Sequence, residues 1–250
     1  MTNRLLMAAA CALLASTASA QSRFQTDILR DTFGYDTDSP AKVSLDKLAQ
    51  GCRARDCIRS IEQPEFLAAD EVDFLRPDDL VLGVEIDGDV RAYPTRILNR
   101  HEIVNDRFGD RAVAVTYCPL CGSGVAFERR VAGEVVELGV SGLLHNNDLV
   151  MYDRKTETLW QQITGEAIVG PRVGNKLEQV PVAMAPWGRW RDAHPDTRVL
   201  APVAGLGSYS RNPYGNYSET DDLHFPVNGL DSRVRPKAVV HAAELDGQAV

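Results

Sequence analysis

Residues 112–128 read Ala112-Val-Ala-Val-Thr-Tyr-Cys118-Pro-Leu-Cys121-Gly-Ser-Gly-Val-Ala-Phe-Glu128. Strand-forming side chains fill both halves of this stretch, and their period is near two, which is typical of β-strands. Gly122 favours a sharp turn between the halves, because glycine tolerates backbone angles that other residues avoid. The stretch therefore predicts two antiparallel strands, 112–117 and 124–131, joined by a turn that carries both cysteines.

Strand-like runs continue on both sides of this turn. The run 80–86 is followed by Asp87-Gly88, a tight hairpin signal, and by a return strand at 90–93. Further strands are expected at 135–140 and 149–152, and short helices at 43–50, 94–106 and 187–193. The links are short and rich in Gly and Asp, so we expect a β-rich α+β fold, a single domain with a mainly antiparallel sheet and short helices. The cysteine turn should lie between two central strands.

The N-terminus has the pattern of a secretory signal. Arg4 is followed by the apolar run 5–15 and by Ala18-Ser19-Ala20, a small-residue cleavage site. The apolar run is shorter than the roughly 20 residues that a membrane-spanning helix needs. We therefore expect removal of a signal peptide at residues 1–20, a periplasmic or secreted location, and no transmembrane span after that removal.

After the signal, the chain divides into an N-terminal extension (21–59) and a single globular domain (60–250). The stretch 76–88 is echoed at 235–247, which suggests a duplicated hairpin that brings the two ends of one sheet together. The second copy stops just after its turn. Its return strand is therefore expected to be missing or very short, and the chain either to be truncated or to end in an exposed sheet edge.

The charge balance argues against two classes of partner. The chain has 27 basic and 35 acidic residues, a formal net charge of −8. Nucleic acids and anionic lipids both reward clustered Lys and Arg, so neither is expected as a partner. A protein partner stays open.

Four cysteines follow the predicted signal: Cys52, Cys57, Cys118 and Cys121. In an oxidising compartment an even number suggests disulfides, and four cysteines allow three pairings. The two local pairs, 52–57 and 118–121, are the simplest pairing.

The Cys118–Cys121 pair carries the chemistry that can be inferred. Two cysteines separated by two residues can form a tight disulfide, act as a redox couple or give two thiolates to a soft metal. A thioredoxin-like site is disfavoured, because there the first cysteine begins a helix and here a strand follows the pair. A four-cysteine zinc site with Cys52 and Cys57 is a weaker alternative.

Three other side chains are potential copper or zinc ligands: His101, His145 and Met151. Each also has a structural interpretation. His101 can lie at the C-terminal end of its helix, His145 can be a turn residue, and Met151 can belong to the core.

Polar residues near these ligands complete the candidate site. Asp148 and Asp153 can act as an acid–base pair, or they can cap turns and pair with Arg154. The remaining candidates are Asn105, Asp106, Ser123, Trp160 and Gln162. The sequence has no nucleophile elbow, phosphate loop, zinc-protease motif or dinucleotide fingerprint.

A series of short motifs links the chain to a known family. They are His101-Glu-Ile-Val-Asn105-Asp106, Tyr117-Cys-Pro-Leu-Cys121-Gly-Ser123, Gly139-Val-Ser-Gly142-Leu-Leu, Val150-Met-Tyr-Asp153-Arg, Leu159-Trp160, Asn212-Pro-Tyr-Gly-Asn-Tyr217 and His224-Phe-Pro-Val227. In these motifs the chain closely resembles the bacterial family filed as domain of unknown function 3179, from about Ser60 to Val250. The resemblance implies an exported or membrane-tethered domain and adds no reaction.

Two departures from the family pattern bear on these expectations. Family members usually have a Gly-Pro-rich loop where this chain has Cys52-Arg-Ala-Arg-Asp-Cys57. The resemblance therefore implies that these cysteines are a local addition, which favours their pairing with each other and weakens the four-cysteine zinc site. The short C-terminus is the second departure, and it puts the last sheet strand in doubt.

Three functions follow from the cysteine turn. The first is a transition-metal binding protein in which Cys118 and Cys121, with His101 or His145, hold copper or zinc. The second is a thiol–disulfide redox protein that uses the same two cysteines. The third is a structural or interaction module in which a Cys118–Cys121 bond is only a clasp.

Overall fold

A central four-stranded antiparallel sheet presents the cysteine turn. The computed structural model describes residues 27–206, 208–240, 244–245 and 248–249, so the predicted signal peptide at 1–20 lies outside the described residues. The strands of this sheet are, in spatial order, β14 (Gln179–Val180), β7 (Ser123–Glu128), β6 (Arg111–Cys118) and β5 (Ile103–Phe108). The two strands predicted around the turn are thus confirmed as the central pair β6–β7.

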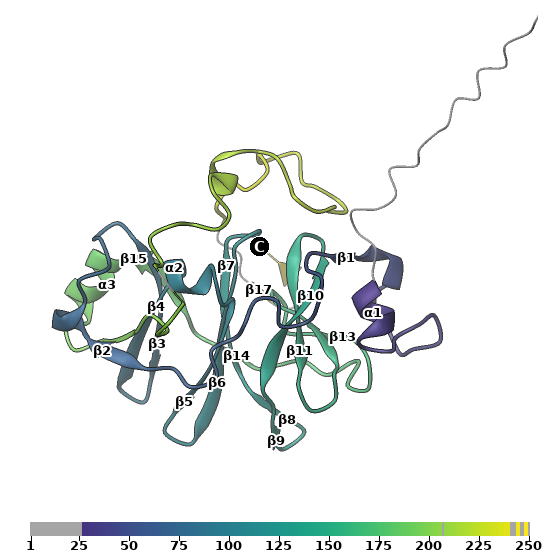
Figure 1. Ribbon diagram of the computed structural model, residues 1–250, viewed down its shortest axis with the longest axis horizontal. Helices are drawn as coiled ribbons and strands as arrows, with labels where there is room; N and C mark the ends of the chain where they lie inside the picture. Colours follow the sequence, from purple (N-terminus) through teal and green to yellow (C-terminus); the bar gives the residue numbers. More distant parts are fainter. Residues whose placement is uncertain (1–26, 207, 241–243, 246–247, 250) are drawn as a thin grey trace, which may run out of the picture.

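Two five-stranded sheets flank the central one (Figure 1). One has the order β1 (Leu48–Gln50), β10 (Leu138–His145), β11 (Asp148–Asp153), β12 (Leu159–Gln161) and β13 (Ala167–Val169). The other has the order β15 (Ala183–Pro186), β3 (Leu80–Ile86), β4 (Asp89–Pro94), β16 (Arg198–Leu200) and β2 (Phe66–Ala68). Among the described strands, every pairing is antiparallel except that of β16 with β4. The β-rich α+β class expected from the sequence is confirmed.

The alternation of side chains along β6 explains why the central sheet is buried on both faces. Ala114 and Cys118 belong to the core shared with the β10–β11 sheet. Val113 and Val115 belong to the core shared with the β3–β4 sheet. Because successive side chains of a strand point to opposite faces, Cys118 faces β10 and β11.

Two of the three described helices cover the outer faces of the flanking sheets, and the third packs into the core between the β3–β4 sheet and the central sheet. The helices are α1 (Asp27–Asp31), α2 (Thr95–Leu98) and α3 (Trp187–Ala193), with 3₁₀ turns at Leu45–Lys47, Ala69–Glu71 and Tyr217–Glu219. α1 packs against β10 and β11, and α3 packs against β3, so each outer face has its own smaller core. Within the described residues we find no helix with the length and apolarity that a bilayer crossing requires.

Two predicted helices are wrong in extent. The helix expected at 94–106 ends at Leu98, and Ile103–Phe108 is strand β5. The β-branched Ile103 and Val104 are fully buried there and pair with β6, so tertiary pairing outweighs local helix propensity. The helix expected at 43–50 is a 3₁₀ turn followed by β1, an edge strand that pairs with β10.

The two ends of the described chain pack differently from what the echo at 235–247 suggests. β17 (Glu244–Leu245) and β18 (Gln248–Ala249) form a separate two-stranded sheet, as do β8 (Arg130–Val131) and β9 (Glu134–Val135). The described strands in this region pair with each other and with no described strand of the β3–β4 sheet, so the two ends of one sheet are not brought together in the way that the echo suggests. In the predicted N-terminal extension, Cys52 and Cys57 form a disulfide.

One long segment without strands crosses the molecule above the sheets. We call the described residues of 204–240 the C-terminal strap; in Figure 1 it is the yellow-green arch at the top. Asn147, in the β10–β11 turn, donates to the Tyr217 hydroxyl (3.1 Å) and accepts from the backbone N–H of Phe225 (3.1 Å). The strap is thereby anchored beside the cysteine turn.

Candidate metal centre

Three potential metal ligands converge where β6 ends and β11 begins. The Sγ atoms of Cys118 and Cys121 and a carboxylate oxygen of Asp148 all lie within 4.8 Å of one another. Cys118 and Asp148 are buried, whereas Cys121 is exposed. Both cysteines are free thiols, and the Cys121 thiol donates to Asp148 Oδ1 at 3.1 Å.

Two tight turns bring these ligands together. The cysteine turn closes when the N–H of Gly122, whose φ is +64°, donates to the Cys118 carbonyl at 2.8 Å. The β10–β11 turn has positive φ at both Asn146 and Asn147, which is the pattern of a two-residue type I′ hairpin. Since β10 and β11 pack against Cys118 through the shared core, this hairpin carries Asp148 to the thiols.

Burial shapes the protonation of this centre. Burial raises the pKa of the Cys118 thiol well above its usual value, and the neighbouring Cys121 raises it further. Burial also raises the pKa of Asp148, although its hydrogen bonds to Cys121 and to the Ile163 N–H oppose that shift. Desolvation thus favours the neutral forms of both groups, and a bound cation would favour the charged forms.

Outer hydrogen bonds hold Asp148 in place. Its Oδ2 accepts from Gln161 Nε2 and from the N–H of Ile163 (3.1 Å). Gln161 in turn accepts from His145 Nδ1 at 2.7 Å. His145, expected as a ligand, therefore orients Gln161 and does not join the group of converging ligands in the described chain.

A second chain of hydrogen bonds supports Cys121. Its Sγ lies 3.0 Å from Ser123 Oγ, which donates to Gln162 Oε1 at 2.9 Å. Gln162 then donates to Thr116 Oγ1 on β6 at 2.9 Å. The predicted candidates Ser123, Asp148 and Gln162 are thus brought to one place.

A cavity of about 240 Å³ opens beside Cys118. It is mostly apolar, and its polar lining includes Glu102, Tyr214 and His224, the last two from the strap. Tyr214 donates to Glu102 Oε1 at 2.9 Å, and burial raises the pKa of Glu102 to about 7. Sequence reasoning missed these three side chains as site residues. All three lie within the motifs that carry the family resemblance, so those motifs were the available signal.

We expect the stability of the protein to fall as pH rises from about 4.5 to 7. In this window Glu102 stays protonated in the folded chain but ionises in the unfolded one, so the folded state binds more protons. A raised pKa of this size corresponds to roughly 3 kcal/mol at pH 7 and above. Urea unfolding of the chelated, reduced protein across this range would measure the change.

Glu102→Gln is the control for this pH dependence. The amide keeps an acceptor for Tyr214 but does not titrate, so the slope of stability against pH should flatten. In both proteins Asp148, with its raised pKa, contributes a residual slope of the same sign, and His101, with its lowered pKa, contributes one of the opposite sign. Equal slopes in wild type and Glu102→Gln would show that Glu102 does not carry the effect.

The other predicted ligands lie in separate surroundings. His101 is buried; its Nδ1–H donates to the Arg59 carbonyl and its Nε2 accepts from the Tyr209 hydroxyl, each at 2.7 Å. Both ring nitrogens are therefore occupied, and His101 does not join the cysteines. Met151 is fully buried within the core cluster that also contains Trp160.

The remaining polar candidates have structural partners. Asp153 is fully buried, where it caps the turn after β11 and accepts from Trp160 Nε1 at 3.1 Å. It does not pair with Asp148, so an acid–base dyad of these two residues is not formed. Asn105 forms hydrogen bonds with the backbone of Leu138, and Asp106 forms an ion pair with Arg91. Asn105 and Asp106 both lie on strand β5 and not at the end of a helix.

The bonding of the cysteines in this structure differs from that in two of the alternatives. The four-cysteine zinc site would need free thiols at Cys52 and Cys57, and these two are bonded to each other. The clasp would need a Cys118–Cys121 bond, which this structure does not contain.

Comparisons with known proteins agree with this arrangement of motifs. Residues 55–250 match the family described as "Protein of unknown function (DUF3179)". No curated protein and no solved structure matches the chain. The match spans most of the chain and includes the cysteine turn, Asp148 and the strap, and the chain therefore belongs to this family of proteins of unknown function.

Proposed function

We propose that the protein binds a thiophilic transition metal, with zinc the best fit, through Cys118, Cys121 and Asp148. The observation that carries this proposal is the convergence of two thiols and a carboxylate oxygen within 4.8 Å. Zinc accepts sulfur and oxygen ligands in tetrahedral sites, and three protein ligands leave a fourth position for water or another molecule. Copper(I) fits less well, because it favours soft ligands and the third ligand here is a carboxylate, with no described histidine in the group.

The surroundings of the ligands support a metal site. Ligands that lie on turns hold a metal well when outer hydrogen bonds orient them. Here Asp148 is held by Gln161 and the Ile163 N–H, and Cys121 is held next to Ser123. The raised pKa of Cys118 means that metal uptake displaces a proton, so affinity should rise with pH.

The direct test is titration of the reduced protein with Zn²⁺ and with Co²⁺. We expect one equivalent of either metal to bind, with a thiolate-to-cobalt absorption band and protection of both thiols from alkylation. Protein titrated in parallel with copper(I) under a competing chelator would rank the metals. Failure to take up any of the three under reducing conditions would overturn the proposal.

A dithiol–disulfide couple is the second candidate. It is favoured by one observation: Cys121 is exposed beside buried Cys118, and its thiol donates to the carboxylate of Asp148. Oxidation would join the two sulfurs with loss of two electrons and two protons, while a disulfide-containing partner is reduced to two thiols. A Cys118–Cys121 potential above about −230 mV, the range of glutaredoxins, together with no metal uptake, would favour this candidate.

A further inference from the structure

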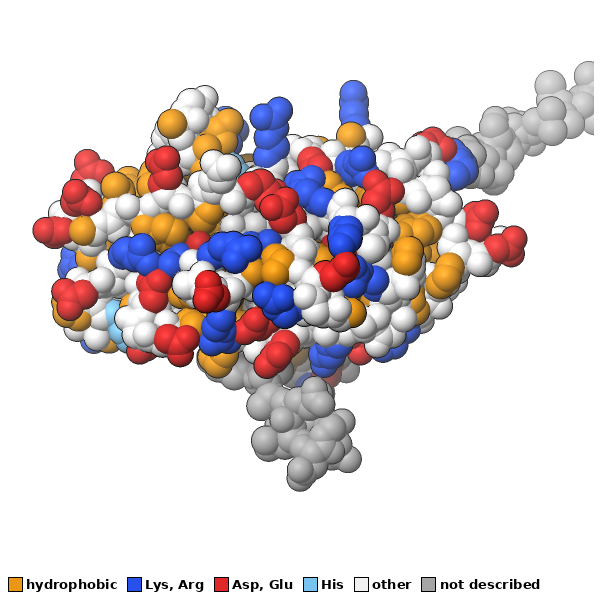
Figure 2. Space-filling view, turned by 90° about the horizontal axis from the view of Figure 1, so that it is seen from below, with side chains coloured by type: hydrophobic (Ala, Val, Ile, Leu, Met, Phe, Trp, Pro, Cys, Tyr) orange, Lys and Arg blue, Asp and Glu red, His pale blue; other side chains and the backbone are white. Residues whose placement is uncertain are grey.

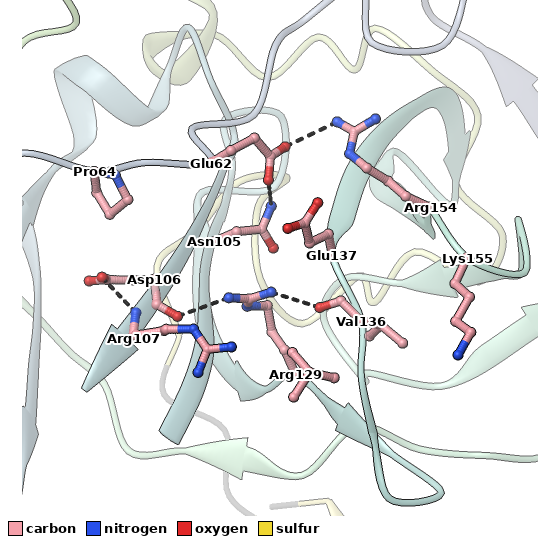
Figure 3. A pocket seen from close by; sticks show the side chains of 11 residues that line it. Glu62, Pro64, Asn105, Asp106, Arg107, Arg129, Val136, Glu137, Arg154 and Lys155 are labelled. Atoms are coloured by element: carbon pink, nitrogen blue, oxygen red, sulfur yellow. Dashed lines mark hydrogen bonds and ion pairs between the residues drawn. The ribbon is translucent and has the colours of Figure 1, made fainter. Parts of the chain in front are cut away.

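A second, polar cavity lies away from the metal centre. It has a volume of about 480 Å³ and shares no lining residue with the cavity beside Cys118. Its charged lining includes Arg107 on β5, Arg129 after β7, Glu137 before β10, and Arg154 and Lys155 after β11. We call it the arginine pocket. Figure 3 shows Arg129 between Asp106 and Val136, with Arg107 on one side and Glu137 and Arg154 on the other.

Arg129 is a buried cation without a carboxylate partner. Its side chain donates to the backbone carbonyls of Val113 (3.3 Å), Val136 (2.8 Å) and Asp106 (3.1 Å). No described carboxylate forms an ion pair with it, although the residue is only 4 % exposed. A guanidinium has five N–H groups, so two donors and a full positive charge remain. A buried charge of this kind is costly unless an anion lies close by.

The acidic residues of the pocket are mostly committed elsewhere. Glu62 accepts from Arg154 (3.1 Å) and from Asn105 (2.9 Å). Asp106 Oδ2 accepts from Arg91 at 2.6 Å and from the Tyr93 hydroxyl. Neither carboxylate therefore forms an ion pair with Arg129, although both attract its charge from a longer distance, as Glu137 does.

The charges left over are unequal in sign. Arg107 is exposed and forms no ion pair with a described residue, which adds a second uncompensated cation. Glu137 is the one lining carboxylate for which the described residues provide no hydrogen bond or ion pair. The two cations without an ion pair, Arg129 and Arg107, thus face a single such carboxylate, Glu137. This local excess of positive charge runs against the net charge of −8 of the chain.

Basic side chains are also prominent on the face of the molecule opposite the strap. Figure 2 shows Lys and Arg side chains gathered in a band across the middle of this face, with acidic side chains beside them. A cation-rich pocket with forked donors is suited to oxygen anions, because guanidinium groups bind carboxylates and phosphates through two parallel hydrogen bonds.

We propose that the arginine pocket binds a small anion that presents carboxylate or phosphate oxygens, with Arg129 at its base and Arg107 at its rim. Arg129 is not a suitable residue to substitute, because it is buried and bonds to three backbone carbonyls, so its loss would also disturb the fold. Arg107 is exposed, so its substitution should leave the fold intact. The proposal does not depend on metal binding, and the two can fail separately.

The test is calorimetric titration of the full chain with citrate and, separately, with inorganic phosphate at low ionic strength. We expect one site for at least one probe, with affinity falling as salt rises. Arg107→Gln should weaken binding by about 10-fold, since a charge-assisted bidentate contact is lost. Glu137→Gln should tighten binding several-fold, because it removes the one free carboxylate that repels the anion.

Arg130→Gln is the matched control. Arg130 is an exposed neighbouring arginine that does not line the pocket, so its loss should leave affinity unchanged. Equal weakening in Arg107→Gln and Arg130→Gln would mean that only general charge attracts the anion, and would overturn the proposal. Weaker binding in Glu137→Gln would also overturn it, because it would indicate a ligand with a cationic group. If neither probe gives a heat of binding at a concentration of about 10 mM, the proposal is likewise overturned, because a specific site would be filled at this concentration.

Discussion

The Cys118→Ser substitution is expected to lower the zinc affinity by at least about 1000-fold. Substitution of a residue that only hydrogen-bonds to a metal ligand already lowers metal affinity by about 10–100-fold, and here a ligand itself is lost. Serine presents a neutral hydroxyl where the metal needs a thiolate, and the remaining Cys121 and Asp148 give two ligands instead of three. The measurement is a zinc titration against a competing chelator. Loss of the thiolate-to-cobalt band provides an independent reading.

Substitution of a buried cysteine can also disturb packing, so a matched control is needed. Ala126→Ser adds a hydroxyl to a fully buried position on β7, and Ala126 lies in the core on the other face of the same sheet. It should cost stability but leave zinc affinity unchanged. Asp148→Asn keeps the side-chain shape and removes the charge, so we expect an intermediate loss, roughly 100-fold. Unchanged zinc affinity in Cys118→Ser would contradict the assignment of the site.

Local signals accounted for the strands around the cysteine turn. The alternation in 112–117 and the Asp87-Gly88 turn each act over a few residues, so the hairpins β6–β7 and β3–β4 were predictable. The prediction of a helix over 94–106 was wrong in its second half, because the apolar residues of 103–108 also suit a strand once β6 provides pairing partners. Local propensity does not include the pairing with a distant strand, so it cannot predict which of the two structures forms.

Contacts between sheets account for what the sequence could not predict. Asp148 meets Cys121 only because the β10–β11 hairpin packs across the face of β6 that carries Cys118. The ring nitrogens of His101 likewise bond to Arg59 and Tyr209, which lie 42 and 108 residues away in the chain. The sequence therefore identified the ligand-bearing turn and named Asp148 as a site candidate, but it did not identify Asp148 as the third ligand.

Asp153→Ala is expected to lower the free energy of unfolding by about 4 kcal/mol, the scale of breaking a buried polar network. The Asp153 carboxylate is fully buried and accepts from the N–H of Thr156 (2.7 Å), from its hydroxyl and from Trp160 Nε1. Removal of the carboxylate leaves these donors without partners and opens a cavity next to Trp160, one of the largest buried side chains. Guanidinium unfolding followed by tryptophan fluorescence would measure the loss.

Asp36→Ala separates burial from turn capping in this prediction. Asp36 Oδ1 caps an exposed turn in the same way, accepting from the Asp38 N–H (3.0 Å) and the Ser39 hydroxyl (3.2 Å). Because water can replace the lost acceptor there, we expect a cost of about 0.5 kcal/mol. Trp160→Phe in the Asp153→Ala background should add less than it costs alone, since one of the stranded donors is then gone. Equal costs for Asp36→Ala and Asp153→Ala would mean that the turn, and not the buried network, determines the role of Asp153.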